Sequence, residues 1–144
     1  MTTAEQLAQH LRDAYARSME DGLAAAGPFV AEALELAHEP AQAADGIKVG
    51  AEMAALWAKE GSMLKSAMPD VALTDVVIRA DGGDVVLSAV MRGTKEDGST
   101  LAHPYTVVYT LRDGLVVRAC ASYDPAPVAD VNRAAFQGLG ATPD

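Results

Sequence analysis

The hydrophobic positions of this chain change their period about halfway along it, from a helical spacing to a two-residue alternation. In residues 3–20 the apolar side chains recur every three or four positions, which predicts an amphipathic helix. Thr3 is placed to cap this helix and Gln6 to complete a capping box, whereas Gly22 is expected to end it. Residues 50–68 predict another helix. Its expected inward side chains are Met53, Leu56, Trp57, Leu64 and Met68.

The segment between these two helices has no single interpretation. Residues 22–31 are rich in alanine, but Gly27-Pro28 interrupts them. Periodicity alone makes residues 32–39 helical, with a first strand as the alternative. Residues 41–48 are expected to form a loop.

The second half of the chain predicts four strands, at approximately residues 71–80, 84–94, 101–111 and 115–124. They are joined at Asp81-Gly82-Gly83, at Lys95-Glu96-Asp97-Gly98 and at Arg112-Asp113-Gly114. Each joint carries a glycine where a hairpin needs a positive φ. Helices followed by hairpins predict an α+β fold with a curved antiparallel sheet. No repeat or linker divides the chain, so residues 1–144 are expected to form one domain, with a frayed tail from Gly138.

Composition and charge exclude several classes of partner. The formal net charge is -9, and the 11 Lys and Arg residues are scattered, so a nucleic-acid backbone or an anionic membrane would be repelled. A single cysteine, Cys120, cannot form an internal disulfide. Because Met1 is not followed by a charged and then apolar leader, we expect a reducing cytoplasm as the location.

The sequence lacks the common signatures of metal and nucleotide sites. His10, His38 and His103 are far apart and have no metal-ligand spacing around them. Neither a glycine-rich phosphate loop nor a Gly-x-Ser-x-Gly motif occurs. We therefore expect no metal, no nucleotide cofactor and no serine hydrolase chemistry.

Strand parity assigns the side chains of the last two predicted strands to two faces. One face of the first of them carries His103, Tyr105, Val107, Tyr109 and Leu111. A three-residue turn would pair Leu111 with Leu115. The side chains that then join this face are Val117, Ala119, Ala121 and Tyr123. Because this face is the more apolar one, we expect it to face the interior.

The two faces predict different roles. On the inner face, small Ala119 and Ala121 beside large Tyr109 and Tyr123 would leave room for a ligand, although an ordinary core could use this room to receive Trp57. The outer face mixes apolar and β-branched groups, which predicts a homodimer interface. The residues expected there are Thr106, Thr110, Arg118 and Cys120.

Two segments near the C-terminus carry a family resemblance. RDGLVVR at residues 112–118 and SYDPAP at residues 122–127, in a chain that begins with helices, resemble the last two strands of the SnoaL-like polyketide cyclases. These belong to the nuclear transport factor 2-like superfamily, which includes the ketosteroid isomerases. The resemblance implies a cone-shaped antiparallel sheet, an α+β barrel, wrapped around the N-terminal helices, with the cone as ligand site. It also implies that residues 32–39 form a short strand ending at His38-Glu39-Pro40.

The resemblance to ketosteroid isomerases implies catalytic residues. Tyr15, seven residues before Gly22, matches that family's catalytic tyrosine, and Glu39 before Pro40 matches its carboxylate base. Such a carboxylate removes a proton beside a carbonyl while a buried phenol donates a hydrogen bond to the enolate oxygen. Val107 stands where the family has a second donor, an aspartate, so efficient steroid isomerisation is not expected.

The resemblance to the SnoaL-like cyclases implies a different pair of catalytic residues, which would close a ring by an aldol reaction without metal or cofactor. Asp124 matches the family's aspartate after the last strand, with His103 as companion. Parity places Asp124 on the outer face unless the strand kinks before Pro125.

Each candidate also has a structural interpretation. Tyr15 and His103 could be a core tyrosine and a strand-start residue, and Glu39 and Asp124 could be turn carboxylates.

Two functions remain open on the sequence. The first is a cofactor-free acid/base enzyme that acts on a small hydrophobic carbonyl compound, as a polyketide cyclase, isomerase or dehydratase. The second is a non-catalytic binding or dimerisation module with the same pocket. In both cases we expect one cavity open near His38 and Glu39. The other side chains expected to contact a ligand are Trp57, Tyr105, Val107, Tyr109, Ala119 and Tyr123.

Overall fold

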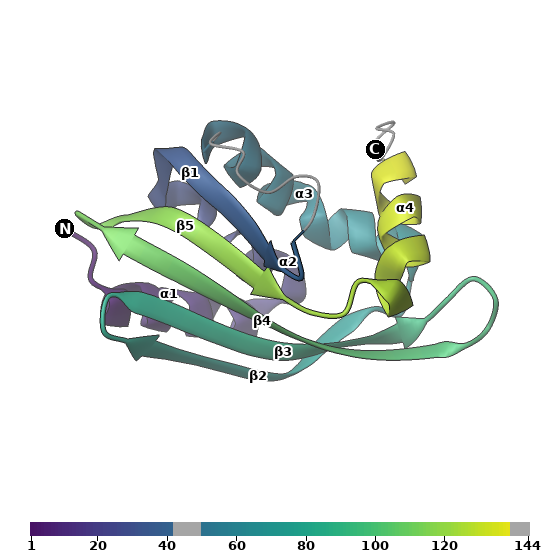
Figure 1. The fold of residues 1–144 in the computed structure, drawn as a ribbon. Coiled ribbons are helices and arrows are strands. Elements are labelled where there is room, and N and C mark those ends of the chain that lie inside the picture. The colour runs from purple at the N-terminus through teal and green to yellow at the C-terminus, as the bar shows by residue number, and fades with distance from the viewer. Residues whose placement is uncertain (42–49, 139–144) are drawn as a thin grey trace.

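A five-stranded sheet with helices on one side forms the fold (Figure 1). The structure is a computed structural model that describes residues 1–41 and 50–138. The strands are β1 (Val30–Glu39), β2 (Ala72–Asp81), β3 (Asp84–Thr94), β4 (Thr100–Arg112) and β5 (Leu115–Ser122). The helices are α1 (Ala4–Arg17), α2 (Met19–Ala24), α3 (Gly50–Ala67) and α4 (Ala129–Gly138). Short 3₁₀ turns, η1 (Gly27–Phe29) and η2 (Ala126–Val128), precede β1 and α4.

The sheet confirms the expected α+β fold and corrects its details. Its strand order is β1-β5-β4-β3-β2, and the three hairpin contacts from β2 to β5 are antiparallel as predicted. However, β1 runs parallel to β5, with His38 opposite Ala121, so the sheet is mixed rather than wholly antiparallel. Because β1 and β2 lie at opposite edges and do not pair, the sheet is open rather than a closed barrel.

The first predicted helix is two helices. Its capping box is present: the Gln6 N–H donates to Thr3 Oγ1 at 3.1 Å, and the Thr3 N–H donates to Gln6 Oε1 at 3.0 Å. The expected end at Gly22 is wrong, because the chain already leaves the helix at Ser18. This residue has extended backbone, and its hydroxyl accepts the N–H of Asp21 at 3.0 Å to cap α2. Gly22 therefore lies inside α2, and the break lets α2 turn away from α1.

The first strand shows where local periodicity misleads. The ten residues of β1 include the stretch 32–39 that periodicity alone makes helical, and the strand ends at Glu39 as the resemblance implied. The EALELA pattern also fits a strand buried on one face, with Leu34 and Leu36 on the inner side. The predicted loop over residues 41–48 lies, except for Ala41, outside the described residues, as does the predicted frayed tail beyond Gly138.

The last hairpin keeps the predicted faces through a different register. Its turn has two residues, Asp113 and Gly114, both with positive φ (54° and 78°), rather than three. Leu111 consequently pairs with Val116 and not with Leu115. An irregularity at residues 110 and 111 then pairs Tyr109 with Ala119, so these two side chains share a face as predicted, although the expected partner of Tyr109 was Val117. Val116, with 0% exposure, therefore enters the core in place of the predicted Val117.

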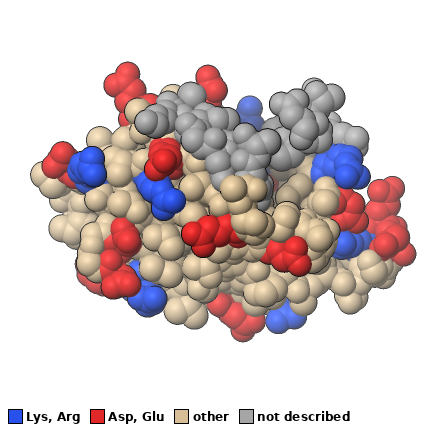
Figure 2. Space-filling model, in the orientation of Figure 1, with Lys and Arg blue, Asp and Glu red and all other residues tan. Residues whose placement is uncertain are grey.

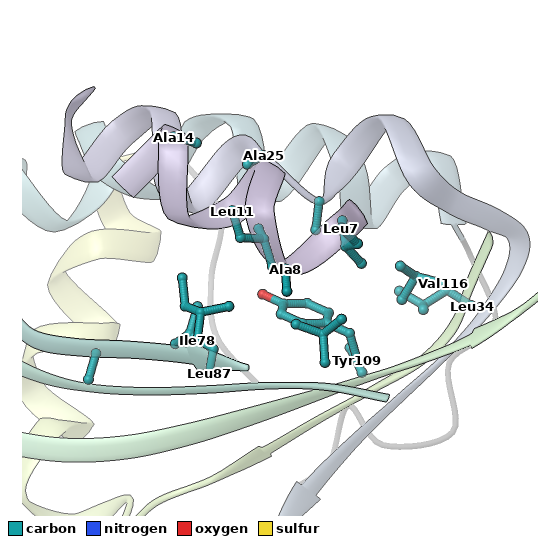
Figure 3. Packing of buried hydrophobic residues seen from close by; sticks show 14 residues of the cluster. Leu7, Ala8, Leu11, Ala14, Ala25, Leu34, Ile78, Leu87, Tyr109 and Val116 are labelled. Atoms are coloured by element: carbon teal, nitrogen blue, oxygen red, sulfur yellow. The ribbon is translucent and has the colours of Figure 1, made fainter. Parts of the chain in front are cut away.

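Two hydrophobic clusters hold the helices on the sheet. In the first, α1 inserts side chains above the strands, and Figure 3 shows Tyr109 lying beneath this helix. Its fully buried large side chains are Leu7, Leu11, Leu34, Val85, Leu87 and Val116, each worth about 1.5–3 kcal/mol of burial. The second cluster joins the end of α3 to α4 and includes Leu64, Met68, Val71, Met91, Leu101, Val128 and Val131. Tyr105 packs against both clusters and so marks where they meet.

The surface is mixed in charge. On the face in Figure 2, Lys and Arg side chains are scattered among the acidic ones rather than gathered into a patch. None of the described helices has the length and apolar character needed to cross a bilayer.

Candidate functional site

A cavity of about 200 Å³ lies between the inner face of the sheet and the helices. Its wall is largely aliphatic and aromatic, with contributions from all five strands and from α1, α2, α3 and α4. The polar side chains in the wall are Tyr15, His38, Glu60, His103, Tyr105, Tyr109, Tyr123 and Asn132. An apolar cavity of about 150 Å³ admits benzene. This cavity is therefore large enough for a molecule of one or two rings.

Nine of the eleven site residues expected from the sequence line this cavity. They are Tyr15, His38, Trp57, His103, Tyr105, Val107, Tyr109, Ala119 and Tyr123. For the residues of β4 and for Ala119 the alternation of strand side chains explains the agreement, because their inner face was assigned correctly.

Glu39 and Asp124 do not line the cavity, and both are exposed. Glu39 follows the lining residue His38 on β1, so its side chain points to the other side of the sheet. Asp124 lies beyond the end of β5. Asp124 Oδ1 accepts the N–H of Ala126 at 3.1 Å, as a turn carboxylate does. Their placement gives no support to the catalytic roles expected for them.

The carboxyl group in the wall is instead Glu60, which the sequence analysis did not select. It lies on α3, three residues after Trp57 and four before Leu64, and all three side chains line the cavity. Burial raises the pKa of Glu60 from an ordinary value near 4.5 to about 7. The signal was present in the sequence, because this spacing places Glu60 on the same helix face as two predicted inward residues.

Three tyrosines line the cavity together with this carboxyl group. Burial raises the pKa of Tyr15, Tyr105 and Tyr109 far above the ordinary value, and the negative charge of Glu60 adds to the rise in each. The Trp57 ring meets the Tyr109 ring edge-on, with centroids 6.0 Å apart, which helps to fix the orientation of both rings. The three phenols therefore remain protonated near neutral pH and can donate hydrogen bonds.

A second polar group lies toward the N-terminal end of β4. His103 is 5% exposed, and its ring meets the Tyr123 ring edge-on at 5.4 Å. Burial lowers the pKa of His103, and the charge of Asp124 acts in the opposite direction. His103 is therefore expected to be neutral at pH 7.

Acid/base chemistry is what this arrangement can perform. A carboxyl group with a pKa of about 7 can accept a proton and return it near neutral pH, and buried phenols can stabilise a negative oxygen. Within residues 1–41 and 50–138, no three His, Cys, Asp or Glu side chains are close enough together to hold a metal ion.

Gly22 positions the ring of Tyr15. A Cβ atom at residue 22 would lie 2.2 Å from Cδ1 of Tyr15, closer than any real contact. Alanine is ordinarily favoured over glycine in a helix by about 1 kcal/mol. We nevertheless expect Gly22→Ala to lower the free energy of unfolding by about 1–3 kcal/mol, because Tyr15 or α2 must shift. Urea denaturation measures this change.

Gly27→Ala is the matched control for that substitution. Its Cβ would lie 3.5 Å from Cβ of Ala54, which is an ordinary contact, so its stability should stay within about 0.5 kcal/mol of the wild type. Equal stabilities for the two variants would show that Gly22 does not constrain Tyr15.

Comparison with known proteins gives a likeness of fold. No family model and no curated protein matches the chain. Among solved structures, a nuclear transport factor 2-like protein of unknown function from Burkholderia pseudomallei is 16% identical, with a TM-score of 0.61, over 91% of this chain and 98% of that one. A candidate polyketide cyclase from Xanthomonas campestris pv. campestris is 22% identical (TM-score 0.58, over 90% of this chain and 99% of that one). A candidate SnoaL-like polyketide cyclase from a Jannaschia species is 16% identical (TM-score 0.59, over 91% and 94%). The chain thus has the nuclear transport factor 2-like fold.

Proposed function

We propose that this protein catalyses proton transfer on a small, apolar carbonyl compound, in a reaction of the cyclase, isomerase or dehydratase type. Glu60 acts as the base, and Tyr15 donates a hydrogen bond to the developing oxyanion. The observation that carries the proposal is a carboxyl group with a pKa of about 7 in an apolar cavity, beside three phenols. Candidate polyketide cyclases among the solved structures of this fold support the same class of compound.

Tyr15 is the favoured donor among the three phenols. Burial raises the pKa of Tyr15 most, and the charges of Tyr109, Tyr105 and Glu60 raise it further, which supports a position close to these groups. Helix α1 is buried along Leu7, Ala8, Leu11 and Ala14, so the backbone that holds Tyr15 is rigid.

The proposed step conserves every atom and needs no cofactor. Glu60 removes a proton from the carbon next to the carbonyl, and the electron pair of the broken C–H bond moves to the carbonyl oxygen. A neutral phenol stabilises that oxygen by a hydrogen bond. The protonated carboxyl group then returns the proton to the same carbon or to another one. Alternatively, the enolate carbon attacks a second carbonyl to close a ring, and the oxygen of that carbonyl takes the electron pair of its π bond and the proton from Glu60.

Exchange of 2-tetralone protons in D₂O tests this step without the natural substrate. This two-ring ketone matches the cavity in size, and its acidic C–H bonds exchange through an enolate. We expect the protein to accelerate the exchange seen by proton NMR, with a rate that rises with pH and levels off above about pH 7, as Glu60 ionises. Glu39→Gln and Asp124→Asn should leave the rate unchanged, since both side chains lie outside the cavity. If 2-tetralone binds and its exchange is no faster than in buffer, the protein is a binding module rather than an enzyme.

We also propose that two copies associate through the outer face of the sheet. On that face Arg118 forms an ion pair with Glu35 at 3.1 Å, and the hydroxyls of Ser88 and Thr106 lie 3.2 Å apart. Because these polar groups pair with one another, the β-branched side chains of the same face are available for contact with a second copy. Cys120 does not take part, because it is 6% exposed and buried in the sheet.

Light scattering at micromolar concentration should therefore give twice the chain mass of 14.9 kDa. Val108→Asp, which places an unpaired charge on the outer face, should give the single mass. A wild-type protein that already scatters as a monomer would contradict the interface.

A further inference from the structure

His103 is a buried polar side chain with one unpaired ring nitrogen. Its Nε2 atom has no hydrogen-bond partner among the described residues, although the residue is 5% exposed. Most buried polar atoms in proteins are paired, so an unpaired one calls for an explanation. The ring is also part of the cavity wall. A ligand in the cavity therefore lies against the imidazole ring, whose Nε2 atom is buried in this ring orientation.

The imidazole and the carboxyl group serve different parts of the cavity. On β4, His103 and Tyr105 are two residues apart, which corresponds to about 7 Å of strand. Tyr105 and Tyr109 both lie toward Glu60, since burial and then the charge of Glu60 raise the pKa of each phenol. His103 lies instead beside Met91, its partner on β3, and Tyr123 at the end of β5. Apart from the Tyr105 phenol, this part of the wall is apolar, with side chains such as Val107, Ala121 and Leu64.

Helix α4 adds a second polar group to the cavity wall. Asn132 contributes a side-chain amide, which can both donate and accept a hydrogen bond, and Val128 from the preceding turn lines the cavity as well. The ion pair between Lys95 and Asp130, at 3.3 Å, ties α4 to the end of β3 and so helps to fix this part of the wall.

We propose that His103 and Asn132 form a second polar subsite, which selects ligands with an oxygen at the end opposite to the reacting carbonyl. The ligand class is a flat molecule of two rings that carries a hydroxyl or carbonyl group at each end. This inference rests on the proposed function for the carbonyl that faces Glu60. A neutral imidazole has one donor and one acceptor nitrogen, so a ligand hydroxyl can bond to either. A half-turn of the ring about its Cβ–Cγ bond moves each nitrogen to the other edge, which lets one of them face the ligand.

Two naphthols that differ by one hydroxyl test the subsite by calorimetry at pH 7. The cavity should bind 2-naphthol, and 2,6-dihydroxynaphthalene should bind about three- to tenfold more tightly, as one additional hydrogen bond provides. In His103→Phe the ratio of the two dissociation constants should fall to about one, because phenylalanine keeps the edge contact with Tyr123 and removes both nitrogens. His10→Phe is the matched control, since His10 lies outside the cavity against Phe29, and should keep the wild-type ratio.

A second variant, on α4, tests the subsite independently of whether His103→Phe folds. Asn132 is only partly buried, so Asn132→Leu should lower the ratio of the two dissociation constants without loss of thermal stability. Equal affinities of wild-type protein for the two naphthols, or a ratio that survives His103→Phe, would overturn the second subsite and leave the proposed function standing. Failure of both naphthols to bind would count against the cavity as a ligand site and so against both proposals.

Discussion

Replacing Glu60 with Gln is expected to abolish catalysed proton exchange and, at the same time, to stabilise the fold above pH 7. Glutamine keeps the shape of the side chain but cannot accept the proton, and loss of a general base lowers a rate by about 10²- to 10⁴-fold. The exchange assay with 2-tetralone measures this loss. A stabilising substitution that removes activity is the signature of a strained functional group.

The stability effect has a defined pH dependence. The pKa of Glu60 is about 7 in the folded protein and near 4.5 in the unfolded chain, so the folded state binds the proton more tightly. Wild-type stability should therefore fall as pH rises from about 4.5 to 7, by up to about 3 kcal/mol. Glu60→Gln lacks this loss and should melt roughly 5–10 °C higher than wild type at pH 8, with little difference at pH 4.

Glu39→Gln is the matched control for both effects, because this carboxylate is exposed and lies outside the cavity. It should change neither the exchange rate nor the melting temperature. Equal melting curves of wild type and Glu60→Gln at pH 8 would argue that the carboxyl group is not held in an apolar environment. If Glu39→Gln slowed the exchange instead, the base would be at the strand end.

Tyr15→Phe is expected to have the second largest effect, with turnover reduced roughly 100-fold or more. Loss of one donor to an oxyanion costs about 2.7–4 kcal/mol of transition-state stabilisation. The ring and its packing against Gly22 remain, so the melting temperature should change little. Initial rates on 2-tetralone, compared as kcat/KM, give the magnitude.

Tyr105→Phe and Tyr109→Phe share the chemistry of that substitution and serve as its controls. Each removes a buried phenol from the same cavity, and each should reduce the rate less than Tyr15→Phe. A Tyr15→Phe rate within threefold of wild type, together with a larger loss in one control, would move the donor role to that tyrosine.

Much of this fold could be predicted from the sequence, because its local signals agree with its tertiary contacts. The glycines at residues 82, 98 and 114 all have positive φ, as the hairpins required. The alternation along β4 placed His103, Tyr105, Val107 and Tyr109 on one inner face. Local signals could not predict the parallel pairing of β1 with β5, since that depends on how α3 carries the chain across the sheet.

The site was predicted less well than the fold, for a physical reason. Glu39 was selected from its position before a proline, yet one residue of difference on a strand exchanges inside for outside, and His38 lines the cavity in its place. Glu60 follows Lys59 on α3 and so resembles a solvated face in the sequence. Only the packing of α3 over the sheet shows that it faces the cavity.

Titration of the Glu60 carboxyl group tests the central claim most directly, because it requires no substrate. In protein labelled with ¹³C at the glutamate side chains, the Glu60 signal is the one that Glu60→Gln removes. The account predicts that this signal titrates with a midpoint near pH 7, well above those of exposed glutamates such as Glu39. A midpoint near 4.5 would show that the carboxyl group is ordinary and solvated, and it would contradict the assignment of Glu60 as the base.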